Sequence, residues 1–347
     1  MAYRAAKIVA APLAIVVTAG VSAAAESASE VASPGDFRAG AAAGVLLAAL
    51  IAYAFFVAAR PLARDRGLSS ALLFLLALMG LKAITVSFSP GFVVDVNTYE
   101  AWALDIARAG PAAMYRSGFF LDYPPGYLYA LWLAGVIARH AGASGAALRV
   151  IVEAPALAFD FALAALMFIF VRRSGRPAAA WIAMLFVALN PALLFDTVVW
   201  GQTDCVMTTI LLLSVAMMLE QEAELAWALM ALAIIVKPQA LMLLPVLGLW
   251  TALRVGCKSW WRSALAFVAV IVVAAAPFQV GHPWTWLPRL YISTAEYYHE
   301  TSVNAFNFMA LIGGLRQSDA GGIFGLSYYA IGMTLLIPVY AFATWAL

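Results

Sequence analysis

The chain has 347 residues, of which 65% are hydrophobic and only 11% are charged. A soluble domain carries about 25% charged residues, and a core of this size cannot hide so much apolar surface from water. The composition therefore excludes a soluble enzyme, a secreted disulfide scaffold and a disordered regulator, and the net charge of +2 gives no indication of nucleic-acid binding.

The apolar runs predict an all-α fold, a polytopic transmembrane helix bundle with about 10 spans, because a membrane-crossing helix needs about 20 apolar residues. Single runs of this kind occupy 8–25, 38–60, 69–88, 151–171, 178–195, 205–219, 263–280 and 323–345. A further stretch, 225–253, has room for two short spans. We expect residues 1–25 to be a signal peptide or a retained first helix, and residues 26–347 to form one membrane domain.

The basic residues predict the orientation, because short loops rich in Lys and Arg stay in the cytoplasm. Three basic clusters are present besides the N-terminus: Arg60/Arg64/Arg66, Arg172/Arg173/Arg176 and Arg254/Lys258/Arg262. They share one side only if the marginal run 125–141 does not cross the membrane, so we expect it to dip in and return or to lie along the surface. A large first loop with short amphipathic helices then lies on the outer face, where most acidic and amide residues gather.

Asp95 is the first candidate for chemistry. It follows an apolar segment just after the run 69–88, and residues 98–109 are predicted to form a short amphipathic helix with Trp102 and Ile106 on one face. A carboxylate at the edge of a low-dielectric region binds a proton more tightly, which suits a general base. The alternative is a helix N-cap, a position that Asp favours.

Two further polar motifs belong to the same outer face. Asp122 and Tyr123 precede Pro-Pro-Gly, which fixes a rigid turn, and the alternative interpretation is an interfacial anchor. Trp200, Gln202 and Asp204 follow the run 178–195. An indole that stacks on a sugar ring, beside an amide and a carboxylate that bind hydroxyls, is typical of sugar recognition. The alternative is an aromatic belt with a capping aspartate.

Lys237 interrupts the long apolar stretch and is followed by Pro238 and Gln239. A lysine near the bilayer interior costs about 2.5–3.5 kcal/mol on insertion scales, so it is a functional candidate. The proline places it at a helix break, where it can face a cavity and bind an anion such as phosphate. The alternative is a side chain that extends to the headgroups.

The remaining candidates are carboxylates and a late outer loop. The segment 296–307 contains two glutamates, His299 and Asn304; it could bind a divalent cation or form a solvated loop face. No HExxH motif is present, and the sequence implies no metal and no cofactor. Asp160 and Glu153 lie within the run 151–171, where we expect buried acids to pair with a base or a backbone donor.

In chain order, the motifs resemble the GT-C superfamily of glycosyltransferases over about residues 69–310. The matching motifs are Asp95-(x)3-Tyr-Glu100-Ala-Trp, Asp122-Tyr-Pro-Pro-Gly, Asn190-Pro-(x)4-Asp196, Trp200-Gly-Gln-x-Asp204 and Lys237-Pro-Gln. The layout is similar to the ER glucosyltransferases that extend the dolichol-linked oligosaccharide and to bacterial mannosyltransferase-like relatives. Those ER enzymes carry His-Phe-Gln-Tyr-Asn where this chain has Trp-Gly-Gln-Thr-Asp.

The resemblance implies an inverting hexosyltransferase with Asp95 as general base and Lys237 near the donor phosphate. It implies a polyprenyl-phosphate-linked sugar donor and a glycan, lipid or protein acceptor, at the periplasmic face of the inner membrane. The substrate-binding residues expected from it and from the motifs are Glu100, Asp122, Tyr123, Trp200, Gln202, Asp204, Lys237, Gln239, His299 and Asn304. Because such enzymes continue through further spans, we expect the chain to be a fragment or a short member.

A secondary transporter or a flippase of lipid-linked sugars is the main alternative. Broken helices and an intramembrane lysine are typical of transporters. The polar residues, however, gather on one face instead of the midplane, and no inverted halves are evident, which favours the enzyme. A non-catalytic membrane scaffold leaves Lys237 and the turn after Asp122 unexplained.

Overall fold

The computed structural model describes residues 34–256, 259–303 and 307–345. The structure is 79% helical, and seven of the described helices are long and apolar enough to cross a membrane. Two shorter apolar helices, Asp204–Leu219 and Ala223–Val236, accompany them. The prediction of an all-α, multi-pass membrane protein is confirmed, whereas the run 8–25 lies outside the described residues.

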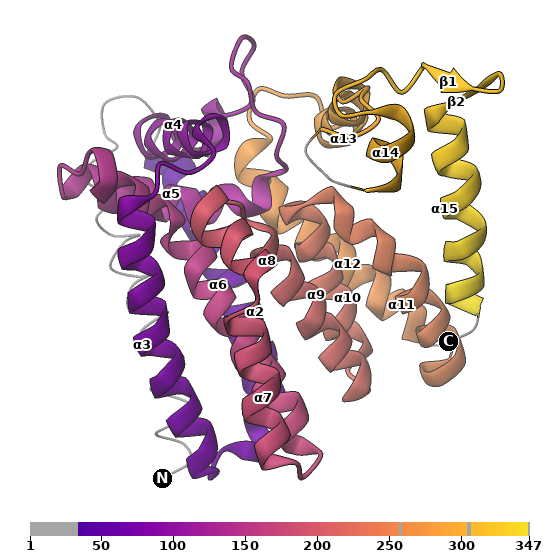
Figure 1. The fold of residues 1–347 in the computed structure, drawn as a ribbon. Coiled ribbons are helices and arrows are strands. Elements are labelled where there is room, and N and C mark those ends of the chain that lie inside the picture. The colour runs from indigo at the N-terminus through magenta and orange to yellow at the C-terminus, as the bar shows by residue number, and fades with distance from the viewer. Residues whose placement is uncertain (1–33, 257–258, 304–306, 346–347) are drawn as a thin grey trace. The chain divides into compact units, whose positions relative to one another are not determined.

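The chain divides into two units, one ending at Trp284 and the other beginning at Thr285. The helices of the first unit are α2 (Pro34–Ala59), α3 (Arg66–Phe88), α4 (Val93–Ala109), α5 (Pro125–His140), α6 (Gly145–Arg173), α7 (Pro177–Ala188), α8 (Pro191–Leu194), α9 (Asp204–Leu219), α10 (Ala223–Val236), α11 (Leu244–Trp250) and α12 (Trp260–Ala275) (Figure 1). Short 3-10 and π-helical segments continue several of them: η1 (Arg60–Leu62), η2 (Pro111–Ala113), η3 (Phe195–Trp200), η4 (Pro238–Leu243), η5 (Thr251–Val255) and η7 (Ala276–Phe278).

Helices α3 and α6 lie side by side and run in opposite directions. Asp65, before α3, forms an ion pair with Arg172 at the end of α6 at 2.8 Å. At the opposite end, the Arg149 guanidinium near the start of α6 donates a hydrogen bond to the carbonyl of Ser89, just after α3. Helix α3 has 23 residues, so at about 1.5 Å per residue these two contacts are about 35 Å apart.

The basic clusters gather at the end of the unit where Asp65 and Arg172 meet. Arg173 forms an ion pair with Glu220 in the turn between α9 and α10. Glu224, in the first turn of α10, accepts a hydrogen bond at 3.5 Å from Ser259, in the loop that carries the third cluster. The arrangement agrees with the expectation that the three clusters share one side. We call this side, defined by Asp65, Arg172, Arg173 and Glu220, the arginine end.

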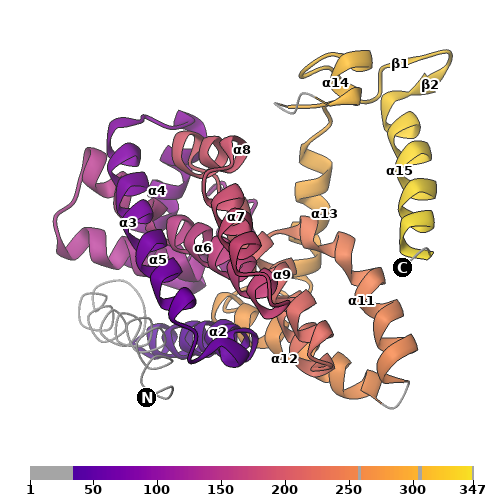
Figure 2. The same cartoon turned by 60° about the horizontal axis from the view of Figure 1, so that its bottom comes forward.

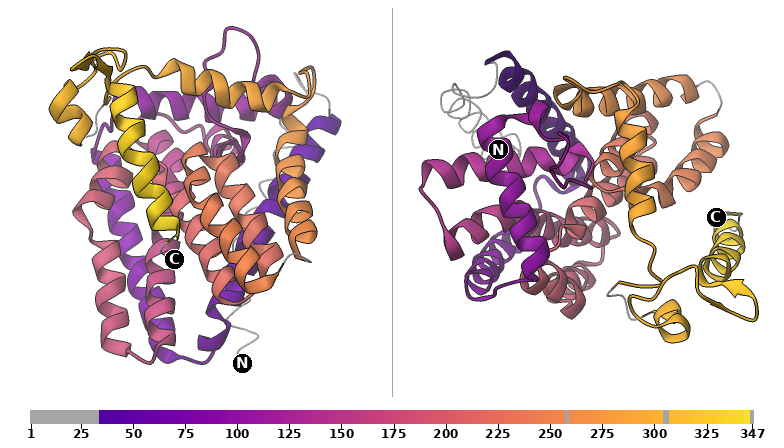
Figure 3. Two further views of the ribbon diagram at one scale, coloured as in Figure 1. Left: turned by 90° about the vertical axis from the view of Figure 1, so that its right-hand side faces the viewer. Right: turned by 90° about the horizontal axis from the view of Figure 1, so that it is seen from above.

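Helices α4 and α5 occupy the opposite end and are not among the candidate spans of the described residues. In Figure 1, α4 is seen almost end-on at the upper end of α3, so it crosses the direction of the long helices, as the side view in Figure 3 also shows. Its buried face includes Trp102 and Ile106, as the periodicity predicts. Gly135 of α5 packs so closely on α4 that a Cβ there would lie 1.9 Å from the Ala103 carbonyl oxygen.

A buried ion pair joins the last third of α3 to the middle of α6. Lys82 of α3 binds Asp160 of α6, and the two side chains are 9% and 1% exposed. The expectation that Asp160 pairs with a base is therefore confirmed. Since neither charge is solvated, each depends on the other for compensation.

Removing one member of this pair is expected to destabilise the fold strongly. The Asp160→Leu variant leaves Lys82 buried without its counter-charge, and we expect it to lose about 3–5 kcal/mol of unfolding free energy. The Lys82→Met/Asp160→Leu double variant removes both charges and is expected to recover most of this loss. Denaturant unfolding in detergent micelles measures both, and a single variant as stable as the wild type would contradict the account.

The second unit contains α13 (Trp286–Tyr297), α14 (Phe308–Gly313), β1 (Gly322–Ile323), β2 (Leu326–Ser327) and α15 (Tyr328–Trp345). The two strands form a short antiparallel hairpin that leads into α15 (Figure 2). Backbone hydrogen bonds tie the loop after α13 to the segment before the hairpin, from Thr301 to Gln317 at 2.8 Å and from Asp319 to His299 at 2.9 Å. Of the candidate spans, only α15 belongs to this unit.

Candidate functional site

Asp95 lies in the first turn of α4, where the helix dipole favours a negative charge. The N-cap residue of α4 is Phe92, so the interpretation of Asp95 as an N-cap is wrong. In the described part of the chain, both side-chain hydrogen bonds to Asp95 reach Oδ2, from Trp200 Nε1 at 2.8 Å and from Gln202 Nε2. These two donors fix the orientation of the carboxylate. They use only Oδ2, so Oδ1 is the oxygen that could accept a proton from a substrate.

The turn after η3 places Trp200 and Gln202 within hydrogen-bond distance of Asp95. Gly201 adopts φ +91°, a backbone conformation that glycine tolerates best, and the amides of Gly201 and Gln202 both donate to the carbonyl of Asp196, at 3.1 and 2.9 Å. The amide of Phe92 donates to the carbonyl of Trp200 at 2.9 Å, and their rings lie 5.0 Å apart. The segment before α4 and the turn after η3 are thus joined directly.

The Gln202 amide connects Asp95 to Lys237, although these residues are far apart in the sequence. Its Nε2 donates to Asp95, and its Oε1 accepts from Lys237 Nζ at 3.4 Å and from the Tyr99 hydroxyl at 3.3 Å. This orientation of the Gln202 amide is the favourable one, because the flipped amide would point its NH2 group at the Lys237 ammonium and two donors would face each other. The carboxylate and the ammonium therefore belong to one hydrogen-bonded network.

Lys237 stands at the break between α10 and η4, as Pro238 predicts. Its side chain forms an ion pair with Asp204, and its Nζ lies 5.6 Å from the centroid of the Tyr123 ring. Burial lowers the pKa of Lys237, but the neighbouring Tyr123 and Asp204 outweigh burial and raise that pKa above its usual range. The residue is only 6% exposed, so the site holds a fixed, largely buried cation.

Aromatic side chains hold the segment around Tyr123 in place. The hydroxyl groups of Tyr99 and Tyr123 are 2.8 Å apart, and Tyr115 donates to the carbonyl of Tyr123 at 2.8 Å. Burial raises the pKa of Tyr99 well above its usual range, and the nearby Tyr123 raises it further, so the phenol stays a hydrogen-bond donor. Tyr99 belongs to the motif that begins at Asp95, but the sequence pattern assigns it no role. Its position four residues after Asp95, on the same face of a helix, is the signal that could have found it.

The other predicted residues of the first unit differ in burial. Glu100 is half-buried on α4; burial raises its pKa and Arg149 opposes the shift. Asp122 is half-buried beside Tyr123, and Gln239 is exposed on η4. The structure thus brings Asp95, Tyr123, Trp200, Gln202, Asp204 and Lys237 together.

Two of the predicted binding residues belong to the late outer loop. His299 is exposed and belongs to the second unit, and Asn304 lies outside the described residues. Their role in binding substrate stays a prediction. Among the described residues, no group of three or more His, Cys, Asp and Glu side chains is placed to hold a metal ion.

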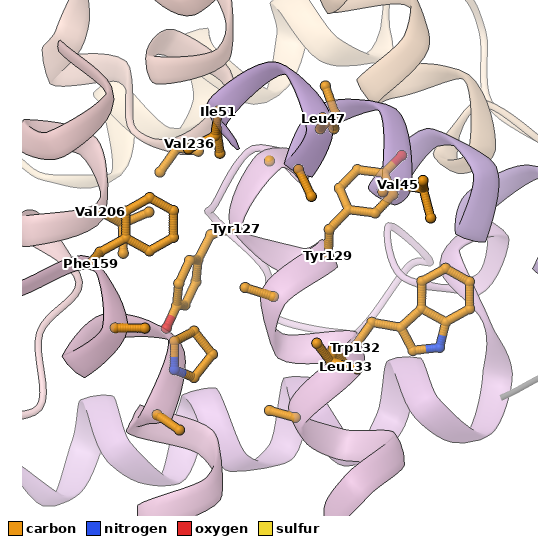
Figure 4. A pocket seen from close by; sticks show the side chains of 18 of the residues that line it. Val45, Leu47, Ile51, Tyr127, Tyr129, Trp132, Leu133, Phe159, Val206 and Val236 are labelled. Carbon is orange, nitrogen blue, oxygen red and sulfur yellow. The ribbon is translucent and has the colours of Figure 1, made fainter. Parts of the chain in front are cut away.

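An apolar cavity of about 460 Å³ lies in the first unit. Its lining comes from α2, α5, α6, α9 and α10, and Figure 4 shows Tyr127, Phe159 and Val206 among the side chains around it. No charged side chain is among the described residues that line it. Val236, in the lining, directly precedes Lys237. Such a cavity suits a hydrocarbon chain better than water, which needs polar partners.

The site lies at the end of the first unit opposite the arginine end, and its side chains can serve three chemical purposes. An oriented carboxylate can accept a proton, a buried ammonium can bind an anion, and an indole beside an amide can contact a sugar. The apolar cavity adds a place for a lipid chain. Glycosyl transfer from a lipid-linked phosphate donor requires this combination, since a hydroxyl must lose a proton while a phosphate leaves.

Comparison with protein-family models identifies a similarity. A family model described as ALG3 protein matches residues 121–311, which is more than half of the chain. The matched region includes Tyr123, Trp200, Gln202, Asp204 and Lys237, and Asp95 lies before it. No curated protein and no solved structure matches the chain.

Proposed function

Because this chain belongs to the ALG3 protein family, which comprises membrane glycosyltransferases of the mannosyltransferase type, we propose that it moves a monosaccharide from a polyprenyl-phosphate donor to an acceptor hydroxyl. The transfer inverts the anomeric carbon. The observation that carries the proposal is the Gln202 amide, which links the Asp95 carboxylate to the Lys237 ammonium in one network. A base and a phosphate-binding cation in one site are the two groups that this reaction needs.

In the proposed reaction, Asp95 accepts the proton of the acceptor hydroxyl on Oδ1. The hydroxyl oxygen forms a bond to the anomeric carbon as the bond from that carbon to the phosphate oxygen breaks, and polyprenyl phosphate leaves with the bonding electrons. Attack on the face opposite the leaving group inverts the configuration. Lys237 stabilises the negative charge that develops on the leaving phosphate. Trp200 and Gln202 hold the carboxylate in position through their hydrogen bonds to Oδ2.

The apolar cavity supports a lipid-linked donor. We assign it to the isoprenoid tail nearest the phosphate, since its lining is apolar and Val236 adjoins Lys237. A donor held in this way needs no soluble nucleotide-binding fold. The site then faces the periplasm, because the arginine end faces the cytoplasm and the network lies at the other end.

Filling the cavity is expected to weaken donor binding selectively. Ala48 of α2 lines the cavity, and the Ala48→Phe variant places a ring in the space assigned to the tail. We expect the KM for a long-chain donor to rise by about tenfold, roughly 1.4 kcal/mol of lost binding, with kcat little changed. The matched control is Ala49→Phe, at an exposed position of α2 outside the lining. If the two variants have equal KM values for the donor, the assignment of the isoprenoid tail to this cavity is wrong.

The test of the proposed function is sugar transfer by the purified protein in proteoliposomes. Polyprenyl-phosphate donors carrying radiolabelled mannose, glucose or arabinose are supplied with a lipid and glycan extract as acceptor. We expect labelled product from the mannose donor, release of polyprenyl phosphate, and no transfer from GDP-mannose. If the label crosses the bilayer still attached to its original donor and no product forms, the flippase alternative replaces the enzyme.

A further inference from the structure

A second buried ion pair lies beneath the candidate site, on the first turns of α6. Arg149 Nε and Glu153 Oε1 are 2.7 Å apart, and the two residues are 4% and 3% exposed. The hydrogen bonds of Arg149 reach Glu153 and Ser89, whereas those of Lys237 reach Gln202 and Asp204. A buried ion pair is often no more stable than a well-packed apolar pair of similar size, so stability alone does not explain it.

Arg149 supports the backbone that leads to Asp95. Its Nη1 donates a hydrogen bond to the carbonyl of Ser89, just after α3. Gly91 adopts φ +68°, and a Cβ at that position would lie 2.6 Å from Arg149 Nη2. The flat guanidinium thus packs directly against the chain that enters α4, and a residue with a side chain does not fit at Gly91.

Glu153 supports the turn that carries Trp200 and Gln202. A Cβ at Gly201 would lie 2.8 Å from Glu153 Oε1, so the carboxylate packs against this turn. The two supported segments are also bonded to each other, since the Ser89 hydroxyl donates to the carbonyl of Val199 at 3.3 Å and the Phe92 amide donates to that of Trp200 at 2.9 Å. One ion pair therefore contacts both segments that converge on Asp95.

We propose that the Arg149–Glu153 pair is a positioning device that sets the distance between Asp95 and its two hydrogen-bond donors, Trp200 and Gln202. Arg149 fixes the segment 89–95, Glu153 fixes the segment 199–202, and the bond between the two charges fixes one segment relative to the other. The expected effect of this pair on the rate of sugar transfer rests on the proposed function. Its expected effect on the rigidity of the two backbone segments does not.

The test uses the Arg149→Lys and Glu153→Gln variants of the full chain. Lysine keeps the charge but lacks the fork that binds Glu153 and Ser89 together, and glutamine keeps the shape but lacks the charge. We expect hydrogen exchange of the Phe92, Gly201 and Gln202 amides to accelerate by at least tenfold, with exchange in α10 unchanged. A misplacement of about 1 Å can reduce a rate about 10²-fold, so we expect kcat to fall by about that factor, with donor KM changed less than threefold.

Two controls separate positioning from folding. The Arg139→Lys variant makes the same substitution on α5, where the guanidinium donates to the Ala107 carbonyl at 2.7 Å, and is expected to leave both readouts unchanged. The Arg149→Met/Glu153→Leu double variant removes both charges, so it is expected to fold even where a single variant does not, and to keep the low kcat and fast exchange.

The outcomes are distinct. Unchanged exchange in folded single variants, or wild-type kcat in the double variant, overturns the positioning role. Faster exchange in the two segments, together with no transfer by the wild-type protein from any polyprenyl-phosphate donor, supports the positioning role and rejects the proposed function instead.

Discussion

The Asp95→Asn variant is expected to lose sugar transfer almost completely, with kcat reduced by about 10²–10⁴-fold, the usual contribution of a general base. Asparagine has nearly the same shape, and its carbonyl oxygen can still accept hydrogen bonds from Trp200 and Gln202, so the fold should persist. It cannot take the proton of the acceptor hydroxyl. The measurement is the initial rate of transfer from a polyprenyl-phosphate sugar in proteoliposomes.

The matched control for this variant is Asp105→Asn, the same substitution ten residues further along α4. Asp105 forms ion pairs with Arg108 at 2.8 Å and with Arg116 at 2.7 Å, away from the network around Gln202. We expect this control to transfer sugar within about twofold of the wild-type rate. Full activity in Asp95→Asn, with the control also active, would end the assignment of Asp95 as the base.

The Lys237→Met variant is expected to lower kcat/KM for the donor by about 10²–10³-fold, the effect of removing one group that stabilises developing charge in a transition state. Methionine fills a similar volume at this buried position but has no charge. The raised pKa of Lys237 means that the wild-type side chain stays protonated throughout the neutral range, so the loss should not depend on pH there. Steady-state kinetics with increasing donor concentration measure the effect.

The Lys237→Arg variant keeps the positive charge and is the control for this experiment. We expect it to retain more activity than Lys237→Met, since a cation can still reach the phosphate. If Lys237→Met has the same donor kinetics as the wild type, the lysine does not bind the donor. Its role would then be structural, through the ion pair with Asp204.

The membrane spans could be predicted from hydropathy because lipid imposes the same requirement along each helix. The stretch 225–253 does split at Lys237, where Pro238 ends α10. The run 178–195 was harder to delimit. Helix α7 ends at Ala188, and a short helix and a π-helix continue the same candidate span to Trp200. A hydropathy average does not detect a change in hydrogen-bond pattern of this kind.

The candidate site was only partly predictable. The residue types of Asp95, Gln202 and Lys237 attract notice in an apolar chain, but their connection depends on the φ of +91° at Gly201 and on the amide orientation of Gln202. Arg149 lies at the end of the first unit opposite the arginine end, where the pattern of basic clusters predicts no arginine. The structure gives the physical reason: its charge is compensated by Glu153 one helical turn later, so it is not a loop charge.

Cysteine labelling can determine whether Asp95 and Lys237 share one site that opens away from the arginine end. In a Cys205→Ala/Cys257→Ala background, single cysteines replace Asn97 and Gln239, the exposed neighbours of the two residues, and Arg64 at the arginine end. A membrane-impermeant maleimide applied to intact spheroplasts should label positions 97 and 239, and should label position 64 only after lysis. Labelling of positions 97 and 239 from opposite sides would contradict the account.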